Sequence, residues 1–301
     1  MDMASPPVGT ATQDSVPSRY ALRVGEIDVL VISDGVLPLP ATTLATNAKP
    51  DELAAWLDDM RQPPGMFKWP LNVVVVRSGG RTVLIDSGAG SEFPDIPGAG
   101  RLASRLDAAG IDPASVTDVV ITHMHVDHVG GLLADGVKDK LRPDVPIHLA
   151  AAEVEFWTSP DFSRNTFAGM PHVLRSAAVR FADEYHSQLR LFETEYEVAP
   201  GVLVQRTGGH TPGHSVVRLA SGGDRLTFAG DLVFQVGFEH PDWYNGFEHD
   251  PEEAARVRVN LLRELAANRE SLVATHLSFP SVCHVAVDGD VFRWVPAPWE
   301  Y

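Results

Sequence analysis

Four side chains of the kind that bind metal ions stand within six residues of this sequence, in the segment His-x-His-x-Asp-His that ends at His128. Residues 116–122 predict a buried strand that leads directly into this segment. Alternate residues of an extended segment share one face, so His123 and His125 can reach the same ion, whereas a turn would direct Asp127 and His128 elsewhere. A polar loop with chance histidines is the alternative, and we disfavour it because only 12 histidines occur in 301 residues.

Three further segments offer a ligand at the point where a predicted strand ends. They are Gly208-Gly209-His210-Thr211-Pro212-Gly213-His214, Ala229-Gly230-Asp231 and Ala274-Thr275-His276. The glycines permit tight turns and a close approach of the backbone. Imidazole and carboxylate ligands suit zinc, and also iron, manganese and cobalt. The sequence therefore predicts a metal site assembled from several strand ends, where a rigid scaffold presents loops for chemistry.

The apolar pattern predicts strands that begin in hairpins and later alternate with helices. Predicted strands cover residues 27–33, 72–76, 82–86, 116–122, 202–205, 215–219, 226–229 and 272–275, with a turn-rich loop at 35–40. Predicted helices cover residues 51–60, 101–109, 150–157, 173–185 and 251–267. This order favours two sheets that are covered by helices.

Length and composition favour one large domain in a reducing compartment. We expect residues 1–19 to form a flexible leader and residues 20–301 a single domain. The polar start lacks the apolar core of a secretory signal, and no run of about 18 apolar residues predicts a membrane span. The net charge of −16 argues against nucleic-acid binding, and the lone cysteine, Cys283, excludes an internal disulfide. We therefore expect a cytoplasmic protein that binds neither nucleic acid nor membrane.

The motifs, taken in order, resemble the pattern of the metallo-β-lactamase superfamily. His-x-His-x-Asp-His, Gly-His-Thr-Pro-Gly-His, Gly-Asp and Thr-His follow one another as in that family, and Leu84-Ile85-Asp86-Ser87-Gly88 matches a further family motif. The resemblance runs from about Tyr20 to the C-terminus and implies an α/β fold, a four-layer αββα sandwich. Within the superfamily, residues 122–132 and 276–285 are most similar to the methyl parathion hydrolase group, and less so to N-acyl homoserine lactonases.

The resemblance implies a dinuclear centre that holds two divalent metal ions. The ligands carried over by position are, for the first ion, His123, His125 and His210, for the second ion, Asp127, His128 and His276, and, as a bridge between the ions, Asp231. Zinc is the expected metal, with manganese, iron or cobalt as alternatives. His214 and Asp86 are expected to order the ligand loops, and Cys283 and His284 to pack in or near the pocket wall.

The resemblance also implies hydrolysis of an ester, lactone or phosphotriester bond by a metal-bound hydroxide. In this interpretation Asp127 and Asp231 are catalytic, and Asp127 also carries a proton to the leaving group. The sequence contains no Gly-x-Ser-x-Gly motif for a serine nucleophile. The alternatives are an iron-dependent oxidoreductase of the same superfamily, a β-lactamase, and a non-catalytic binding protein, which the complete ligand set disfavours.

A small hydrophobic molecule is the expected substrate. Lactonases place a tyrosine three residues after the bridging aspartate, whereas this chain has Phe234 at that position. The aromatic residues expected to line an apolar pocket, with core packing as the alternative for each, are Phe156, Trp157, Phe167, Phe234, Phe238, Trp243 and Phe279. The sequence leaves open whether the protein forms a homodimer.

Overall fold

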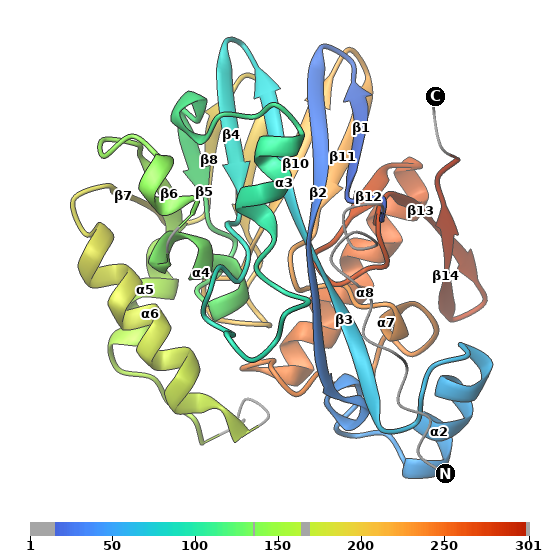
Figure 1. Ribbon diagram of the computed structural model, residues 1–301. Helices are drawn as coiled ribbons and strands as arrows, with labels where there is room; N and C mark the ends of the chain where they lie inside the picture. The colour runs from blue at the N-terminus through green and yellow to red at the C-terminus, as the bar shows by residue number, and fades with distance from the viewer. Residues whose placement is uncertain (1–15, 135, 164–168, 299–301) are drawn as a thin grey trace.

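Two seven-stranded β-sheets lie face to face between outer layers of helices (Figure 1). The computed structural model describes residues 16–134, 136–163 and 169–298. The order of layers is helix, sheet, sheet and helix, so the predicted α/β fold with four layers is confirmed.

The first sheet contains the strands of the N-terminal half, arranged in the order in which they occur in the chain. Its members are β1 (Arg19–Val24), β2 (Ile27–Pro40), β3 (Met66–Ser78), β4 (Arg81–Ile85), β5 (Asp118–Val120), β6 (Ile147–Ala150) and β7 (Leu189–Phe192). Neighbours from β1 to β4 are antiparallel, and neighbours from β4 to β7 are parallel. The parallel strands therefore end at one common edge, which is the edge that leads into His123.

The second sheet contains the strands of the C-terminal half. Its members are β8 (Glu195–Ala199), β9 (Val202–Arg206), β10 (Ser215–Ser221), β11 (Asp224–Phe228), β12 (Ser271–Val273), β13 (Cys283–Asp288) and β14 (Val291–Pro296). Only β11 and β12 pair in parallel among the strands described in this sheet. The ends of β11 and β12 lead into Asp231 and His276, so these two ligand-type residues leave the sheet side by side.

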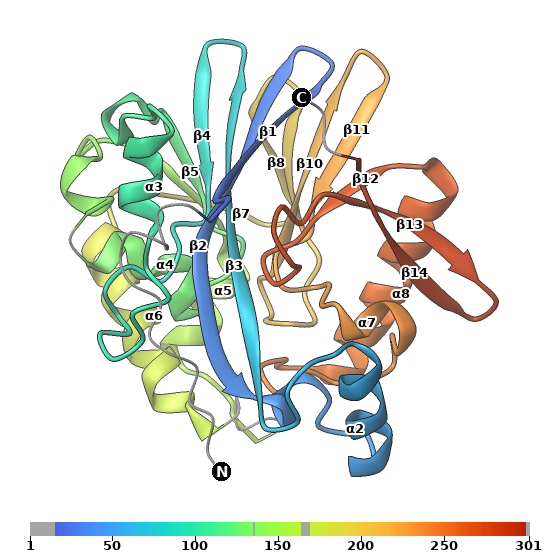
Figure 2. The ribbon, with the colours of Figure 1, turned by 45° about the vertical axis from the view of Figure 1, so that its right-hand side comes forward.

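Helices cover the outer face of each sheet, as Figure 2 shows from a second direction. The first sheet is covered by α3 (Leu102–Ala108), α4 (Val126–Leu133), α5 (Ala151–Thr158) and α6 (Pro171–Tyr185). The second sheet is covered by α7 (Val236–Glu239) and α8 (Pro251–Asn268), and α2 (Pro50–Asp59) lies near the far end of β2 and β3. Short 3-10 turns are η1 (Ala41–Leu44), η2 (Pro113–Ser115) and η3 (Lys138–Lys140).

The centre of β3 explains why the sheets stack. Residues 73–76 are four valines in a row, and all four are buried. Because strand residues alternate between faces, Val74 and Val76 pack in the core between the two sheets, and Val73 and Val75 pack under the helices. A strand that is apolar on both faces must be covered on both faces, and the layers satisfy that requirement.

Strand β2 continues further than the sequence indicates. Residues 35–40 were expected to form a loop, but they pair with β3 as far as Pro40 opposite Met66. A bulge between Ser33 and Gly35 accommodates the change of register, and a side chain at Gly35 would collide with the carbonyl oxygen of Gly98. The loop prediction is therefore wrong, because pairing with distant residues of β3 outweighs the local turn signal.

The predicted leader lies mostly outside the described residues, which begin at residue 16. Strand β1 starts at Arg19 and pairs with β2, so the last predicted leader residue already belongs to the sheet. The proposed division into a leader and one domain stays a prediction for the remainder. Among the described helices, none is both long and apolar enough to cross a membrane.

A buried ionic cluster lies at the start of β5, at the opposite end of the strand from the histidines. Asp118 is fully buried, accepts hydrogen bonds from Arg81 and from the Thr117 hydroxyl at 2.7 Å, and lies 3.0 Å from His148 Nε2. Burial raises the pKa of Asp118, but the hydrogen bonds from His148, Arg81 and Thr117 outweigh it and lower that pKa to about 2.

Replacement of Asp118 by asparagine should therefore destabilise the protein in a pH-dependent way. The folded-state pKa lies below the unfolded value, so the stabilisation is present above about pH 4 and is lost as the pH falls towards 2. Asp118→Asn should lower the free energy of unfolding by about 2 kcal/mol at pH 7, and by less at pH 3. Urea unfolding measures both values, with the exposed Asp144→Asn as control. An equal loss at both pH values would contradict this account.

Candidate metal centre

All seven ligand-type residues predicted from the sequence come together at one edge of the sandwich. They form two groups, His123, His125, His210 and Asp231 in the first, and Asp127, His128 and His276 in the second. Within each group the candidate ligand atoms lie within 4.8 Å of one another. The first sheet contributes the segment after β5, and the second contributes the segments after β9, β11 and β12. The separation of Asp127 and His128 from the two preceding histidines arises because α4 begins at Val126 and turns them away.

The Asp231 carboxylate stands between the two groups. Its Oδ2 lies 3.0 Å from His276 Nε2 and 3.4 Å from His210 Nε2, and its Oδ1 lies 3.1 Å from His128 Nε2. The Asp231 side chain and the imidazoles around it are buried. Oδ1 therefore faces the second group and Oδ2 lies close to both groups, so the carboxylate contacts both, as a bridging ligand must.

The charge states of the first ligand group suit a cation. Burial, with the neighbouring His128 and His125, lowers the pKa of His123 well below its usual value, and burial lowers the pKa of His125 to about 3 despite the opposing pull of Asp231. Burial would raise the pKa of Asp231, but His276, His128 and His123 together lower it well below the usual range. Neutral imidazoles and an ionised carboxylate are the forms that bind metal ions.

One buried nitrogen tests whether the residues fit a metal. His123 Nε2 is inaccessible to solvent and has no hydrogen-bond partner within the described part of the chain. A buried polar atom without a partner costs roughly 1–3 kcal/mol, so such atoms are rare in folded proteins. This nitrogen faces the Asp231 carboxylate at 3.8 Å, too far for a hydrogen bond and suited to an ion between them. The donor set of imidazoles and carboxylates therefore fits divalent metals such as zinc.

Buried polar side chains fix the ligand segments from behind. Asp86 lies 2.8 Å from His128 Nδ1 and accepts a hydrogen bond from the Thr122 backbone at 2.8 Å. The His214 ring accepts a hydrogen bond from the Asp231 backbone at 3.1 Å, and His276 Nδ1 lies 2.8 Å from the Pro70 carbonyl oxygen. Such partners set the orientation of each ligand ring and the nitrogen that it presents.

A cavity of about 180 Å³ opens beside the ligands and is almost entirely apolar. Asp127, Asp231, His125 and His276 form part of its wall. The remainder comes from the β2–β3 arm (residues 35–40 paired with 66–71), the loop after β4, the start of α4, the start of α6 and the segment before α8. These residues are Leu37, Leu39, Trp69, Phe93, Ile96, Val126, Met170, Leu174 and Phe247. Sequence reasoning did not single out these residues, because their common location depends on the long pairing of β2 with β3.

The aromatic residues that were expected in the pocket are mostly packed around it. Phe234 is buried and stacks on the His276 ring at 5.4 Å, and the Trp157 ring lies 5.8 Å from the His125 ring. Phe156 packs against Trp157, and Trp243 stacks on His240. Phe238 lies in the core under α8, Phe279 packs against the core between the sheets, and Phe167 lies outside the described residues. None of the six that are described is among the residues that line the cavity.

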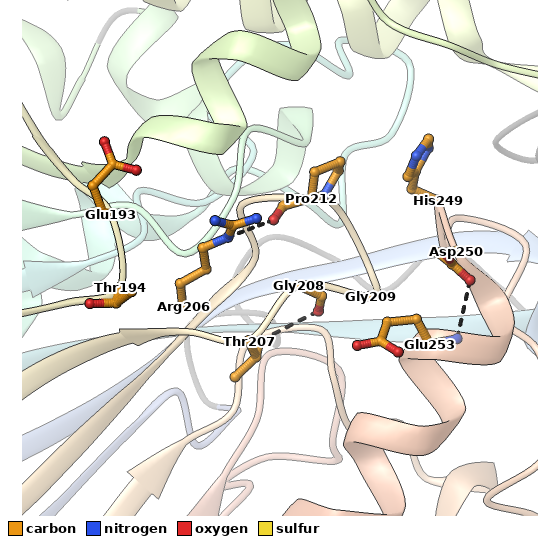
Figure 3. Close-up of a pocket in the computed structure, with 10 residues that line it drawn as sticks. All are labelled: Glu193, Thr194, Arg206, Thr207, Gly208, Gly209, Pro212, His249, Asp250 and Glu253. Atoms are coloured by element: carbon orange, nitrogen blue, oxygen red, sulfur yellow. Dashed lines mark hydrogen bonds between the residues drawn. The ribbon is translucent and has the colours of Figure 1, made fainter.

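A second hollow, of about 480 Å³, lies behind the loop that carries His210 (Figure 3). It is lined by Arg206, Gly208, Gly209, Pro212, His249, Asp250 and Glu253, together with three other residues, and none of its lining residues is a ligand of either group. Arg206 Nε donates to the Pro212 carbonyl oxygen at 2.9 Å and so closes the base of the His210 loop (Figure 3). The smaller apolar cavity has four ligand-type residues in its wall, so it is the better candidate for a substrate site.

The sequence matches a known family over most of the sandwich. A model of the metallo-beta-lactamase superfamily matches residues 67–276, a segment that includes all seven ligand-type residues. The chain therefore belongs to this superfamily. An N-acyl homoserine lactonase from Bacillus sp. is 23% identical over 193 residues, which make up 61% of this chain and 64% of that protein. The chain thus spans about 64% of the length of the curated relatives that it matches.

Solved structures show the same fold over nearly the whole chain. AidC, a dizinc quorum-quenching lactonase in complex with the product N-hexanoyl-L-homoserine, has a TM-score of 0.86 at 24% identity and covers 94% of this chain and 99% of that chain. Hydrolase AbOPH of the beta lactamase superfamily has a TM-score of 0.81 at 26% identity, covering 95% and 99%. Together the lactonase relatives and hydrolase neighbours support a metal-dependent hydrolase. The finer resemblance to the methyl parathion hydrolase group stays a prediction.

Replacement of Asp231 should remove metal from both ligand groups, because its carboxylate contacts imidazoles of each. Asp231→Ala should contain less metal than the unaltered protein after dialysis against metal-free buffer, as measured by elemental analysis. His186→Ala serves as the control, since His186 is exposed and lies outside both groups. A folded Asp231→Ala protein with undiminished metal content would show that the carboxylate does not hold the ions.

Proposed function

We propose that this protein is a dinuclear metal-dependent hydrolase that cleaves an ester or lactone bond in a neutral, hydrophobic substrate. The observation that carries the proposal is the position of Asp231 between two ligand groups, at the wall of an apolar cavity. Zinc is the metal that we propose, since imidazole-rich sets with carboxylates suit it. Two bound ions would supply Lewis acidity and lower the pKa of a water molecule towards neutrality.

The protein's own residues have distinct tasks in this proposal. His123, His125 and His210 would hold the first ion, Asp127, His128 and His276 would hold the second, and Asp231 would contact both. Asp127 also forms part of the cavity wall, so its carboxylate is placed to pass a proton to a leaving group there. Trp69 lines the same cavity, and its buried indole N–H has no hydrogen-bond partner among the described residues.

The composition of the cavity wall supports a neutral substrate. Apart from the metal-binding side chains, its described wall is aliphatic or aromatic and includes no lysine or arginine. An anionic substrate group that lies away from the metal centre, such as the carboxylate of a β-lactam, would lose its hydration there without gaining a cationic side chain as partner. Apolar groups gain roughly 25 cal/mol per Å² of surface removed from water. Hydrophobic acyl or aryl groups therefore fit best.

A substrate panel on zinc-loaded protein tests the proposed activity. The panel contains an N-acyl homoserine lactone, an aryl ester, a phosphotriester and a cephalosporin, and chelator-treated protein serves as control. We expect the lactone or the aryl ester to be hydrolysed fastest, and chelation to abolish turnover. Elemental analysis of protein expressed without added metal, together with oxygen consumption, tests the alternative of an iron-dependent oxidoreductase. Oxygen uptake without hydrolysis would overturn the proposal.

Leu174 and Val173 on α6 provide a matched pair for testing the cavity. Leu174 is buried and lines the cavity, whereas its neighbour Val173 is 51% exposed. Leu174→Ala should lower kcat/KM for a long-acyl substrate by roughly 10-fold, because about 1–2 kcal/mol of apolar burial is lost. A short-acyl substrate should lose less, and Val173→Ala should leave both rates unchanged. Equal losses for the two substrates in Leu174→Ala would place the acyl group elsewhere.

A further inference from the structure

A buried carboxylate outside the ligand set joins two of the segments that carry the ligands. Glu153 lies on α5, and its side chain is fully buried. Its Oε1 accepts hydrogen bonds from the Met124 backbone at 2.9 Å and from the Trp157 indole at 2.8 Å. Its Oε2 accepts from the Thr211 hydroxyl at 2.7 Å and from the Gly213 backbone at 2.9 Å. Four donors thus converge on a single carboxylate.

The four donors lie beside the ligands of one group only. Met124 stands between His123 and His125, and Thr211 directly follows His210. These three histidines, with Asp231, form the first ligand group. The Trp157 ring, held by the same carboxylate, packs edge to face against His125 at 5.8 Å. No ligand of the second group adjoins any of these four donors in the sequence, since Asp127, His128 and His276 lie elsewhere.

The His210 loop packs directly against α5 at Gly213. A Cβ atom built on Gly213 would lie 2.4 Å from the Glu153 backbone nitrogen and 2.5 Å from its Cβ. The loop therefore sits directly on α5, and glycine is required at this position. A buried carboxylate is costly unless its acceptor sites are filled, and here two donors reach each oxygen. The two histidine segments come from different sheets. The Glu153 carboxylate joins them, together with a backbone hydrogen bond from Ser215 to Thr122 at 3.0 Å.

We propose that Glu153 is a positioning residue that sets the spacing of the first metal site, and that its loss weakens that site without weakening the second. The proposal rests on the proposed dinuclear centre. Glutamine at position 153 would keep the size of the side chain but turn an amide N–H₂ towards two of the four donors. That repulsion would push the His210 segment away from the His123 segment.

Zinc binding, measured by competition with a chromophoric chelator, tests this assignment. The unaltered protein should bind two ions, and Glu153→Gln should bind the first-site ion about 10-fold more weakly or worse, which is the range for residues that orient metal ligands. Glu270→Gln is the matched control, because Glu270 is also buried and accepts a hydrogen bond from Thr227, far from the ligands. The control should bind both ions with unchanged affinity.

Two further proteins, each lacking one histidine ligand of one metal site, show which site Glu153→Gln affects. In a His276→Ala protein, which retains the first group, Glu153→Gln should weaken the remaining ion. In a His210→Ala protein, which retains the second group, it should change nothing. A residue needed only for folding would affect both backgrounds alike, and that result would overturn the proposal. Equal zinc affinity of Glu153→Gln and the unaltered protein would overturn it too.

A milder variant guards against a failure of Glu153→Gln to fold, which circular dichroism would reveal. Thr211→Val removes one donor and leaves the carboxylate in place, and it should weaken the first-site ion in the same direction by a smaller factor. If Glu153→Gln does not fold, unchanged zinc affinity in Thr211→Val would refute the positioning role. If the unaltered protein itself bound no zinc, the proposed dinuclear centre would fail, and this result is distinct from a failure of Glu153 alone.

Discussion

The structure depends on the burial of several ionisable side chains around a single carboxylate, that of Asp231. Imidazoles from both ligand groups surround it, and burial alone would make its ionised form costly. The cost is offset because His276, His128 and His123, with a hydrogen bond from His128, favour the charged carboxylate. Around this centre Asp86, His214 and Glu153 each bond to a ligand or to the backbone beside one. The site is therefore a buried polar network inside an apolar sandwich, with Asp231 at its centre, the other ligand-type residues around it, and further polar side chains that hold those residues.

The sandwich provides what such a network needs, which is rigid strand ends from two directions. Strand β5 of the first sheet and strands β11 and β12 of the second end at the same edge, and the core between the sheets holds their separation. Parallel pairing of β11 with β12 brings Asp231 and His276 to within 3.0 Å of each other. One sheet could not supply ligands on both sides of Asp231.

In the proposed function, most of the residues that would contact the substrate come from other parts of the chain than the metal ligands. The cavity wall comes largely from the extended arm of β2 and β3 and from α6, whereas the ligand-type residues follow the central strands. Phe234 illustrates the separation, since it stacks on the ligand-type His276 and supports its orientation from outside the cavity wall. Under that proposal, substitutions at the paired ends of β2 and β3 or on α6 would alter the substrate while the ligand groups stay in place.

The sequence by itself determined the fold class and the candidate ligand residues, because both can be recognised from patterns of residues that are close together in the chain. Strand periodicity, glycine turns and the histidine motifs involve residues that are near one another in the chain. Only the tertiary structure decided the extent of β2, the lining of the cavity and the position of Glu153. These features depend on contacts between distant segments, such as Leu37 opposite Trp69 in the arm and Glu153 beneath Thr211. An aromatic residue has the same local pattern in a pocket wall as in a core, and only packing distinguishes the two.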